Sequence, residues 1–105
     1  MIDHVISVNG VSIRLTDERW VHITEEHCEL AGLRMEVLET VTDPERILEG
    51  NYGALMAVRE NKPGKYLVVV YNEEERGDDG FIITAFLTRR INSLNRRKQI
   101  WPVLQ

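Results

Sequence analysis

The fold of this chain is decided by two apolar runs, YLVVVY at residues 66–71 and FIITAFL at residues 81–87. Both runs are short, rich in β-branched and aromatic residues, and bounded by turn residues, which favours strands over helices. The first run has no polar residue from Leu67 to Val70, so both of its faces should be buried, as in a central strand. Together with residues 54–59, the two runs predict a three-stranded antiparallel meander.

The second run and the residue after it, Thr88, carry two hydroxyl groups that are the first candidates for a functional site. Side chains of a strand alternate between its two faces. We therefore expect Thr84 and Thr88 on one face. On the other face we expect apolar side chains, namely Phe81, Ile83, Ala85 and Leu87.

The chain before residue 54 predicts a β-ribbon followed by helices. Residues 3–15 predict a peripheral hairpin, because Asn9-Gly10 is typical of a type I′ turn. Residues 16–50 predict the helical half: a first helix capped at Thr16 or Asp17 that continues to Gly32, and a second over 33–42. Asp43-Pro44-Glu45 predicts a third, short helix that runs through Leu48. The fold class is α+β, with the helices packed on an antiparallel sheet of three or more strands.

The whole chain, residues 1–105, is expected to form a single domain, with its sheet in residues 54–90 and a basic C-terminal tail in 91–105. A single cysteine, Cys28, excludes an internal disulfide framework and fits a reducing compartment. No signal peptide or membrane-spanning run is present, so we expect a cytoplasmic protein without a membrane partner.

Charge is distributed very unevenly along the chain. Residues 1–79 carry 8 basic and 17 acidic side chains, whereas residues 80–105 carry five basic ones and no acidic one. Such a basic segment can contact nucleic acid, or it can pair with an acidic surface of its own fold or of a partner. Because the protein is acidic overall, any contact with nucleic acid should be local.

No common catalytic or cofactor motif is present: the chain has no Gly-rich phosphate loop, no G-x-S-x-G and no H-E-x-x-H. His22 and His27 are five residues apart, a spacing that places their imidazoles on different faces of a helix. We therefore expect no metal site and no cofactor.

Several short motifs resemble one family. They are WVHI at residues 20–23, EHCEL at 26–30, DPERI at 43–47, YLVVV at 66–70 and ITAF at 83–86. In this order they resemble phage-associated and bacterial nuclease-like domains of the barnase/EndoU/colicin/RelE-like (BECR) superfamily. Phage-linked members of that superfamily carry H-I…R-H-P-E in an N-terminal helix and T-A-Y in a later strand. The resemblance covers about residues 18–90.

The resemblance implies a toxin-like or phage-associated ribonuclease that needs no metal and has its active site on the open face of the sheet or in a cleft. It implies that the helix histidines of the family match His22 and His27, and that the strand-end hydroxyl matches Thr84. The chain departs from the family at Glu26, Cys28 and Phe86, where arginine, proline and tyrosine are frequent.

The chemistry of metal-free RNA cleavage can be compared with the residues directly. It needs a base for the 2′-hydroxyl proton, an acid for the leaving 5′-oxygen, and donors for the charge on phosphorus. Histidine suits both proton transfers, so His27 is the first catalytic candidate, followed by Thr84, Arg89 and His22. The candidate phosphate-binding residues are Arg90, Lys65, Arg59, Thr88, Arg96 and Arg97.

Each candidate also has an ordinary structural explanation. His27 can be a core histidine, His22 a solvated one among glutamates, and the arginines can pair with acidic helix faces. Two functions therefore remain: an endoribonuclease that leaves a 2′,3′-cyclic phosphate, or a non-catalytic module of the same fold that binds a protein or dimerises. The partners to seek are RNA, a cognate inhibitor protein and a second copy of the chain.

Overall fold

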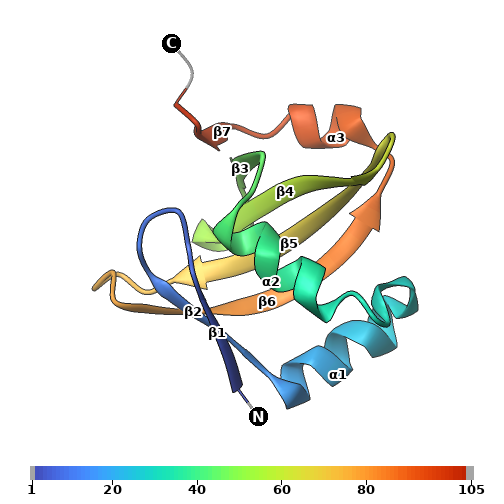
Figure 1. Cartoon of the computed structure of the whole chain (residues 1–105). Coiled ribbons are helices and arrows are strands. Elements are labelled where there is room, and N and C mark those ends of the chain that lie inside the picture. Colours follow the sequence, from blue (N-terminus) through green and yellow to red (C-terminus); the bar gives the residue numbers. More distant parts are fainter. Residues whose placement is uncertain (1, 104–105) are drawn as a thin grey trace.

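The computed structural model describes residues 2–103 and folds into one seven-stranded sheet with helices (Figure 1). The strands are β1 (Ile2–Ile6), β2 (Ser12–Thr16), β3 (Arg46–Glu49), β4 (Leu55–Lys62), β5 (Lys65–Glu73), β6 (Asp79–Thr88) and β7 (Gln99–Trp101). The helices are α1 (Asp17–Glu26), α2 (Arg34–Thr42) and α3 (Ile91–Asn95). The strand order is β1-β2-β6-β5-β4-β3-β7, and the α+β class is confirmed.

The central position of β5 follows from its apolar sequence, as predicted. It pairs antiparallel with β4 on one side and with β6 on the other. Leu67, Val68 and Val69 are all buried, so consecutive side chains fill the cores on opposite faces of the sheet. A strand with a solvent-exposed face would not bury consecutive residues in this way.

The predicted alternation along β6 is wrong at its start, because the strand contains a β-bulge. Val70 pairs with Thr84 and Tyr71 with Ile82, so Ile83 is the extra residue. Ile82 therefore takes the place that was predicted for Ile83, and it lies in the core with Ala85 and Leu87. The bulge turns Ile83 outward, beside Thr84.

The N-terminal hairpin forms as predicted and lies at one edge of the sheet, but it is part of that sheet and its turn is of a different type. β2 joins the main sheet by pairing parallel with β6, whereas we predicted an antiparallel sheet. In the turn, the Gly10 N–H donates to the Ser7 carbonyl over 2.9 Å, and only Gly10 has a positive φ, at 83°. A type I′ turn requires positive φ at two residues, so this turn belongs to another class.

The two helices of residues 16–42 lie close to their predicted positions. Thr16 is the N-cap of α1, because its Oγ1 accepts a hydrogen bond of 3.0 Å from the Arg19 N–H. α1 ends at Glu26 instead of continuing to Gly32, since His27 leaves the helical conformation at φ −131° and ψ 72°. A short 3₁₀ turn over Cys28–Leu30 leads from there to α2.

The predicted helix after Asp43-Pro44 is wrong, because these residues lead into β3. Asp43 caps the C-terminus of α2 instead, donating its N–H to the Glu39 carbonyl. Ile47 and Leu48 are adjacent and both fully buried. One turn of surface helix cannot bury two consecutive side chains in opposite directions, whereas a strand inside a sheet does so. β3 achieves this by pairing with β4 on one side and β7 on the other.

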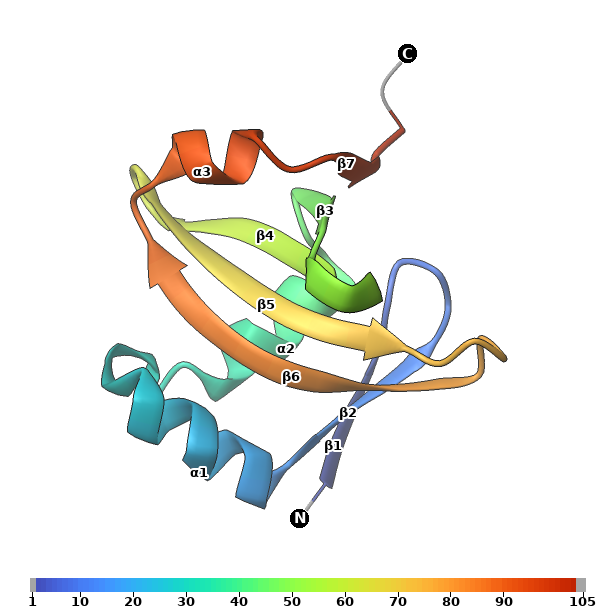
Figure 2. The same cartoon turned by 180° about the vertical axis from the view of Figure 1, so that it is seen from behind.

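The two faces of the sheet are covered to very different extents. α1 and α2 cover one face over the larger of two apolar clusters, which includes Ile13, Ile23, Val37 and Val69 (Figure 1). On the other face, α3 lies only along one margin (Figure 2). Much of this second face, called the open face below, has no helix over it. None of the helices within residues 2–103 has the length and apolar character needed to cross a bilayer.

The orientation of α1 about its own axis can be tested by replacing two of its side chains, one at a time, with alanine. Trp20 packs against the core beneath the helices, whereas His22 is exposed. Trp20 is only partly buried, so Trp20→Ala should cost about 2–3 kcal/mol and lower Tm by about 10 °C. His22→Ala, two residues along the same helix, should shift Tm by no more than about 2 °C. Equal shifts in a thermal melt would contradict this placement of the helix.

Candidate functional site

The open face contains two adjoining hollows. We call the first the Arg90 hollow, which has a volume of about 430 Å³ and is lined by His27, Met56, Phe86, Leu87, Thr88, Arg90, Ser93, Leu94 and Arg97. The second, the Tyr52 hollow, has about 410 Å³ and is lined by Asn51, Tyr52, Ala54, Met56, Val70, Asn72, Ile83, Thr84, Phe86 and Arg97. They share three residues, Met56, Phe86 and Arg97, so together they form a continuous surface of the size that ligands occupy.

Packing of α3 explains why basic residues reach this surface. Leu94 of α3 is buried in an apolar cluster with Leu48, Met56 and Val68 on the open face. Burial of Leu94 fixes the helix there, and with it the positions of Arg90 and Arg97 at either end. The basic segment is therefore docked along one margin of the open face (Figure 2).

Local hydrogen bonds position the two arginines. The Thr88 Oγ1 accepts a hydrogen bond of 3.0 Å from the Arg90 N–H, which shapes the exit from β6. The Arg97 Nη1 donates to the Glu49 carbonyl over 3.2 Å and to Asn51 Oδ1 over 3.3 Å. Both contacts use Nη1, so the Nε and Nη2 edge of Arg97 can face an anion.

His27 lies where the open face meets the end of α1. Its ring centroid is 6.2 Å from that of Phe86, and its Nδ1 lies 3.7 Å from Glu29 Oε1. About a third of the His27 side chain is exposed. The imidazole is thus neither buried in the core nor fully solvated, and a ligand in the Arg90 hollow can reach it.

A third hollow of about 310 Å³ lies between α1 and β6, and we call it the helix-edge hollow. Its lining includes His22, His27 and Thr84, together with Glu26. The sequence predicted that the two histidines point in different directions. Both line this hollow, because His27 is outside the regular helix and its direction no longer follows the helical period.

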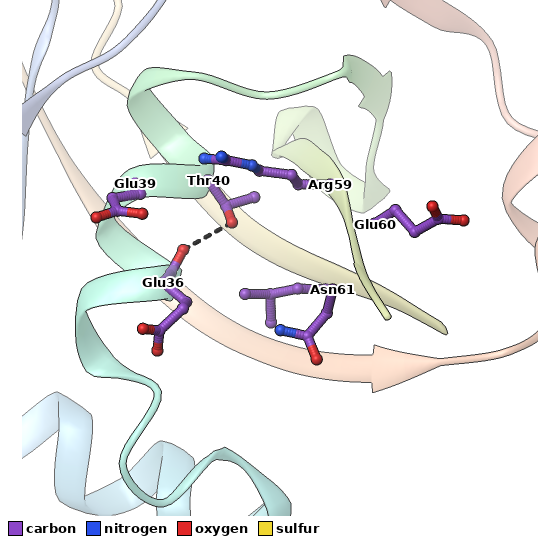
Figure 3. Close-up of a pocket in the computed structure, with 7 residues that line it drawn as sticks. Glu36, Glu39, Thr40, Arg59, Glu60 and Asn61 are labelled. Atoms are coloured by element: carbon purple, nitrogen blue, oxygen red, sulfur yellow. Dashed lines mark hydrogen bonds between the residues drawn. The ribbon is translucent and has the colours of Figure 1, made fainter. Parts of the chain in front are cut away.

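The four remaining candidates lie away from the two open-face hollows. Arg59 is on the helix-covered side of the sheet, in a hollow of about 180 Å³ that it shares with Glu36, Glu39 and Glu60 (Figure 3). The Arg89 guanidinium lies over the β4–β5 turn, 3.8 Å from where a Cβ on Gly64 would be. Lys65 and Arg96 are also absent from the lining of either hollow.

The hollow around Arg59 cannot serve the same purpose as the open face. Three carboxylates line it, and Thr40 Oγ1 donates 2.7 Å to the carbonyl of Glu36 (Figure 3). The Glu36 Oε2 is buried and has no hydrogen-bond partner within residues 2–103. The three carboxylates would repel a phosphate, so the surroundings of Arg59 do not favour its predicted role as a phosphate ligand.

The charges of the open-face hollows are different from those of the protein as a whole. The net charge of the chain is −4. Yet the residues described around the Arg90 and Tyr52 hollows include Arg90, Arg97 and His27 and no carboxylate. The hydroxyls of Thr84, Thr88 and Ser93 add neutral hydrogen-bond donors. This combination can bind an anion and stabilise negative charge that develops on it.

One titratable group is strongly perturbed, but it lies elsewhere. Burial raises the pKa of Tyr71 well above its usual value, and the nearby Glu73 carboxylate raises it further. Tyr71 is fully buried in the core beneath the helices, and its hydroxyl has no hydrogen-bond partner within residues 2–103. It therefore stays protonated and takes no part in the site.

The sequence prediction missed several residues of this surface. Tyr52, Asn72, Phe86 and Ser93 line the hollows but were not among the candidates. Tyr52 left a signal in the sequence, because an aromatic residue between Asn51 and Gly53 stands alone in a polar turn. The others could be found only after the pairing of β5 with β6 and the docking of α3 were known.

No group of three or more His, Cys, Asp or Glu side chains within residues 2–103 is arranged to hold a metal ion. Comparison with protein-family models gives no match, and comparisons with curated proteins and with solved structures give none either. The function of the chain is therefore inferred from the geometry and charge of the open face.

Proposed function

We propose that this chain is a metal-independent endoribonuclease with a BECR-like fold and its active site on the open face. One observation carries the proposal: the residues that line the Arg90 and Tyr52 hollows include a histidine, two arginines and three aliphatic hydroxyls but no carboxylate, on a protein that is otherwise acidic. The resemblance of the sequence motifs to BECR nucleases supports it, since two of the three residues matched to that family, His27 and Thr84, line these hollows, and the third, His22, lines the helix-edge hollow.

The proposed reaction uses the substrate's own 2′-hydroxyl as the nucleophile. The 2′-oxygen attacks phosphorus and the bond to the 5′-oxygen breaks, which gives a 2′,3′-cyclic phosphate and a free 5′-hydroxyl. His27 takes the 2′-hydroxyl proton, and His22, along the helix-edge hollow, is the candidate acid for the leaving oxygen. Arg90 and Arg97 stabilise the charge on phosphorus, with Thr84 as a neutral donor.

The reaction has a product and a salt dependence that can be measured with pure protein and mixed RNA. Cleavage should continue in excess EDTA, because every proposed group is a side chain. Each new 3′ end should carry a 2′,3′-cyclic phosphate. Raising salt from 50 to 200 mM should slow cleavage of subsaturating RNA about fivefold or more, because an acidic protein holds RNA only through a few cations.

Two arginines on opposite faces of the sheet provide the matched control. Arg90→Ala should lower the rate tenfold or more, whereas Arg59→Ala should leave it within twofold. The hydrogen bonds that position Arg90 use its backbone N–H and its carbonyl, so its side chain can be removed without disturbing the turn. RNA left intact by pure, folded protein from pH 5 to 8 would refute the ribonuclease.

The alternative, a module that binds a protein or dimerises, also has one observation in its favour. β7 is the last strand in the sheet, and Ile100 and Val103 at this edge are exposed. An unpaired strand edge with apolar side chains can add a strand from another chain. An inactive protein that is dimeric in solution would favour this second function.

A further inference from the structure

Tyr52 is in a conformation that its own side chain disfavours. It is the one non-glycine residue within 2–103 with a positive φ, at 54°, and its ψ is 38°. Glycine or asparagine adopts this left-handed region far more readily than an aromatic residue does. The ring is also fully exposed, so it gains nothing from burial. Neither backbone preference nor packing accounts for tyrosine here, and a strained residue beside a hollow points to a ligand.

The turn that carries Tyr52 is held firmly in place. The Gly50 N–H donates to the Ala54 carbonyl over 2.8 Å, and the Ala54 N–H donates to the Asn51 carbonyl over 3.0 Å. Arg97 ties the same turn to the C-terminal segment through Asn51 and Glu49. The backbone that carries the aromatic ring and the Arg97 guanidinium are therefore linked by hydrogen bonds at the rim of the Tyr52 hollow.

The floor of that hollow is apolar and is suited to a flat ring. Met56, Val70 and Phe86 line it, and Asn72 contributes an amide with both donors and acceptors. A nucleobase combines a flat apolar face with polar edges. The hollow thus offers surfaces for both parts of a base, with Arg97 beside it for the adjoining phosphate.

We infer that Tyr52 is a stacking platform for an unpaired base of single-stranded RNA, with Arg97 bound to a neighbouring phosphate. This inference rests on the proposed function and assigns its substrate class. Bases in a duplex are stacked on each other and cannot lie on a protein ring, whereas bases of a single strand can. The carboxylates of an acidic protein segment would also pair with the arginines, but they offer no ring for the exposed tyrosine, whereas every nucleotide of a single strand carries both a phosphate and a base.

The test separates binding from cleavage by using a probe that cannot be cut. A fluorescently labelled, fully 2′-O-methylated RNA octamer of mixed sequence lacks the nucleophile, so its binding is independent of any nuclease activity. Fluorescence anisotropy at 100 mM salt gives Kd for the single strand and for the same octamer in a duplex. We expect the single strand to bind at least tenfold more tightly.

Tyr52→Asn removes the ring while suiting the left-handed backbone, and Tyr52→Phe keeps the ring as the matched control. Tyr52→Asn should weaken binding of the single strand tenfold or more, and Tyr52→Phe should stay within about twofold. Circular dichroism should report an unchanged fold, because the side chain is fully exposed.

The outcomes distinguish this inference from the ribonuclease proposal. Binding that depends on the ring, in a protein that leaves natural RNA intact, supports the stacking platform and rejects the nuclease. Cleavage of natural RNA with equal Kd values for wild type and Tyr52→Asn supports the nuclease and overturns the platform. Equal affinity for single strand and duplex, or no binding at all, overturns it as well.

Discussion

His27→Ala is expected to lower the rate of RNA cleavage about a hundredfold or more. Loss of a positioned acid or base typically costs between about 10² and 10⁴ in rate. His27 has the position that such a role requires, because it lines both the Arg90 hollow and the helix-edge hollow and is partly exposed. Single-turnover cleavage of a labelled RNA, followed at pH 7, measures the effect on chemistry directly.

Two controls make this result specific. His4→Ala is the same substitution on the exposed strand β1, outside the Arg90, Tyr52 and helix-edge hollows, and it should retain full activity. The His27 N–H bond to the Ile23 carbonyl, 2.8 Å long, involves the backbone only, so alanine can also make it. His27→Ala should therefore melt close to the wild type. A folded His27→Ala that keeps more than a tenth of the activity would remove His27 from the mechanism.

The largest effect on stability is expected for Gly80→Ala, at about 3 kcal/mol or more. Gly80 in β6 pairs with Ile13 of β2 and with Glu73 of β5, so it lies where three strands meet. A Cβ added there would lie 2.2 Å from the Asn72 carbonyl oxygen and 2.6 Å from Ile13 Cδ1. Overpacking a rigid site costs about 1–3 kcal/mol and occasionally more, and here the obstacle is backbone that cannot rotate away.

Urea unfolding followed by circular dichroism gives the change in the free energy of unfolding. Gly77→Ala is the matched control, because Gly77 has a φ of 74° but nothing within 4 Å of its added Cβ. It should cost only about 1 kcal/mol, the penalty of placing a side chain in the left-handed region. Equal losses for the two variants would mean that β6 can shift away from β5 and β2.

The sequence predicted which types of residue line the candidate site, but not which individual residues of each type belong to it. His27, Thr84 and Thr88 were identified by residue type and position along the chain, and all three line hollows that meet at the open face. Residue type and position along the chain could not show which arginines reach the candidate site. Arg59 and Arg90 both lie in or next to predicted strands, yet they are on opposite faces of the sheet.

Which arginine reaches the site depends on contacts distant in sequence. Arg97 belongs to it because Leu94 buries itself beside Met56 and because Asn51 accepts a hydrogen bond from the guanidinium. Tyr52 entered the site for a similar reason, since the β3–β4 turn places it beside β5 and β6. Sequence spacing carries no information about such contacts.

The sequence by itself determined the elements whose local preference and burial agree. The apolar run of β5 specified a central strand, Thr16 specified the start of α1, and the stripe of Val37 and Val41 specified α2. In each case the local signal, whether an apolar run, a capping side chain or an apolar stripe, agrees with the burial found in the fold, so no distant partner is needed to decide the outcome.

Where the local sequence preference disagrees with the burial of the side chains, only the tertiary structure decided which element forms. Asp43-Pro44-Glu45 favours a helix, but Ile47 and Leu48 can both be buried only as a strand between β4 and β7. Three other features also depend on tertiary contacts: the bulge at Ile83, the parallel pairing of β2 with β6, and the docking of β7. Each requires a partner strand far away in sequence, and the free energy of that pairing and burial exceeds the small local preference.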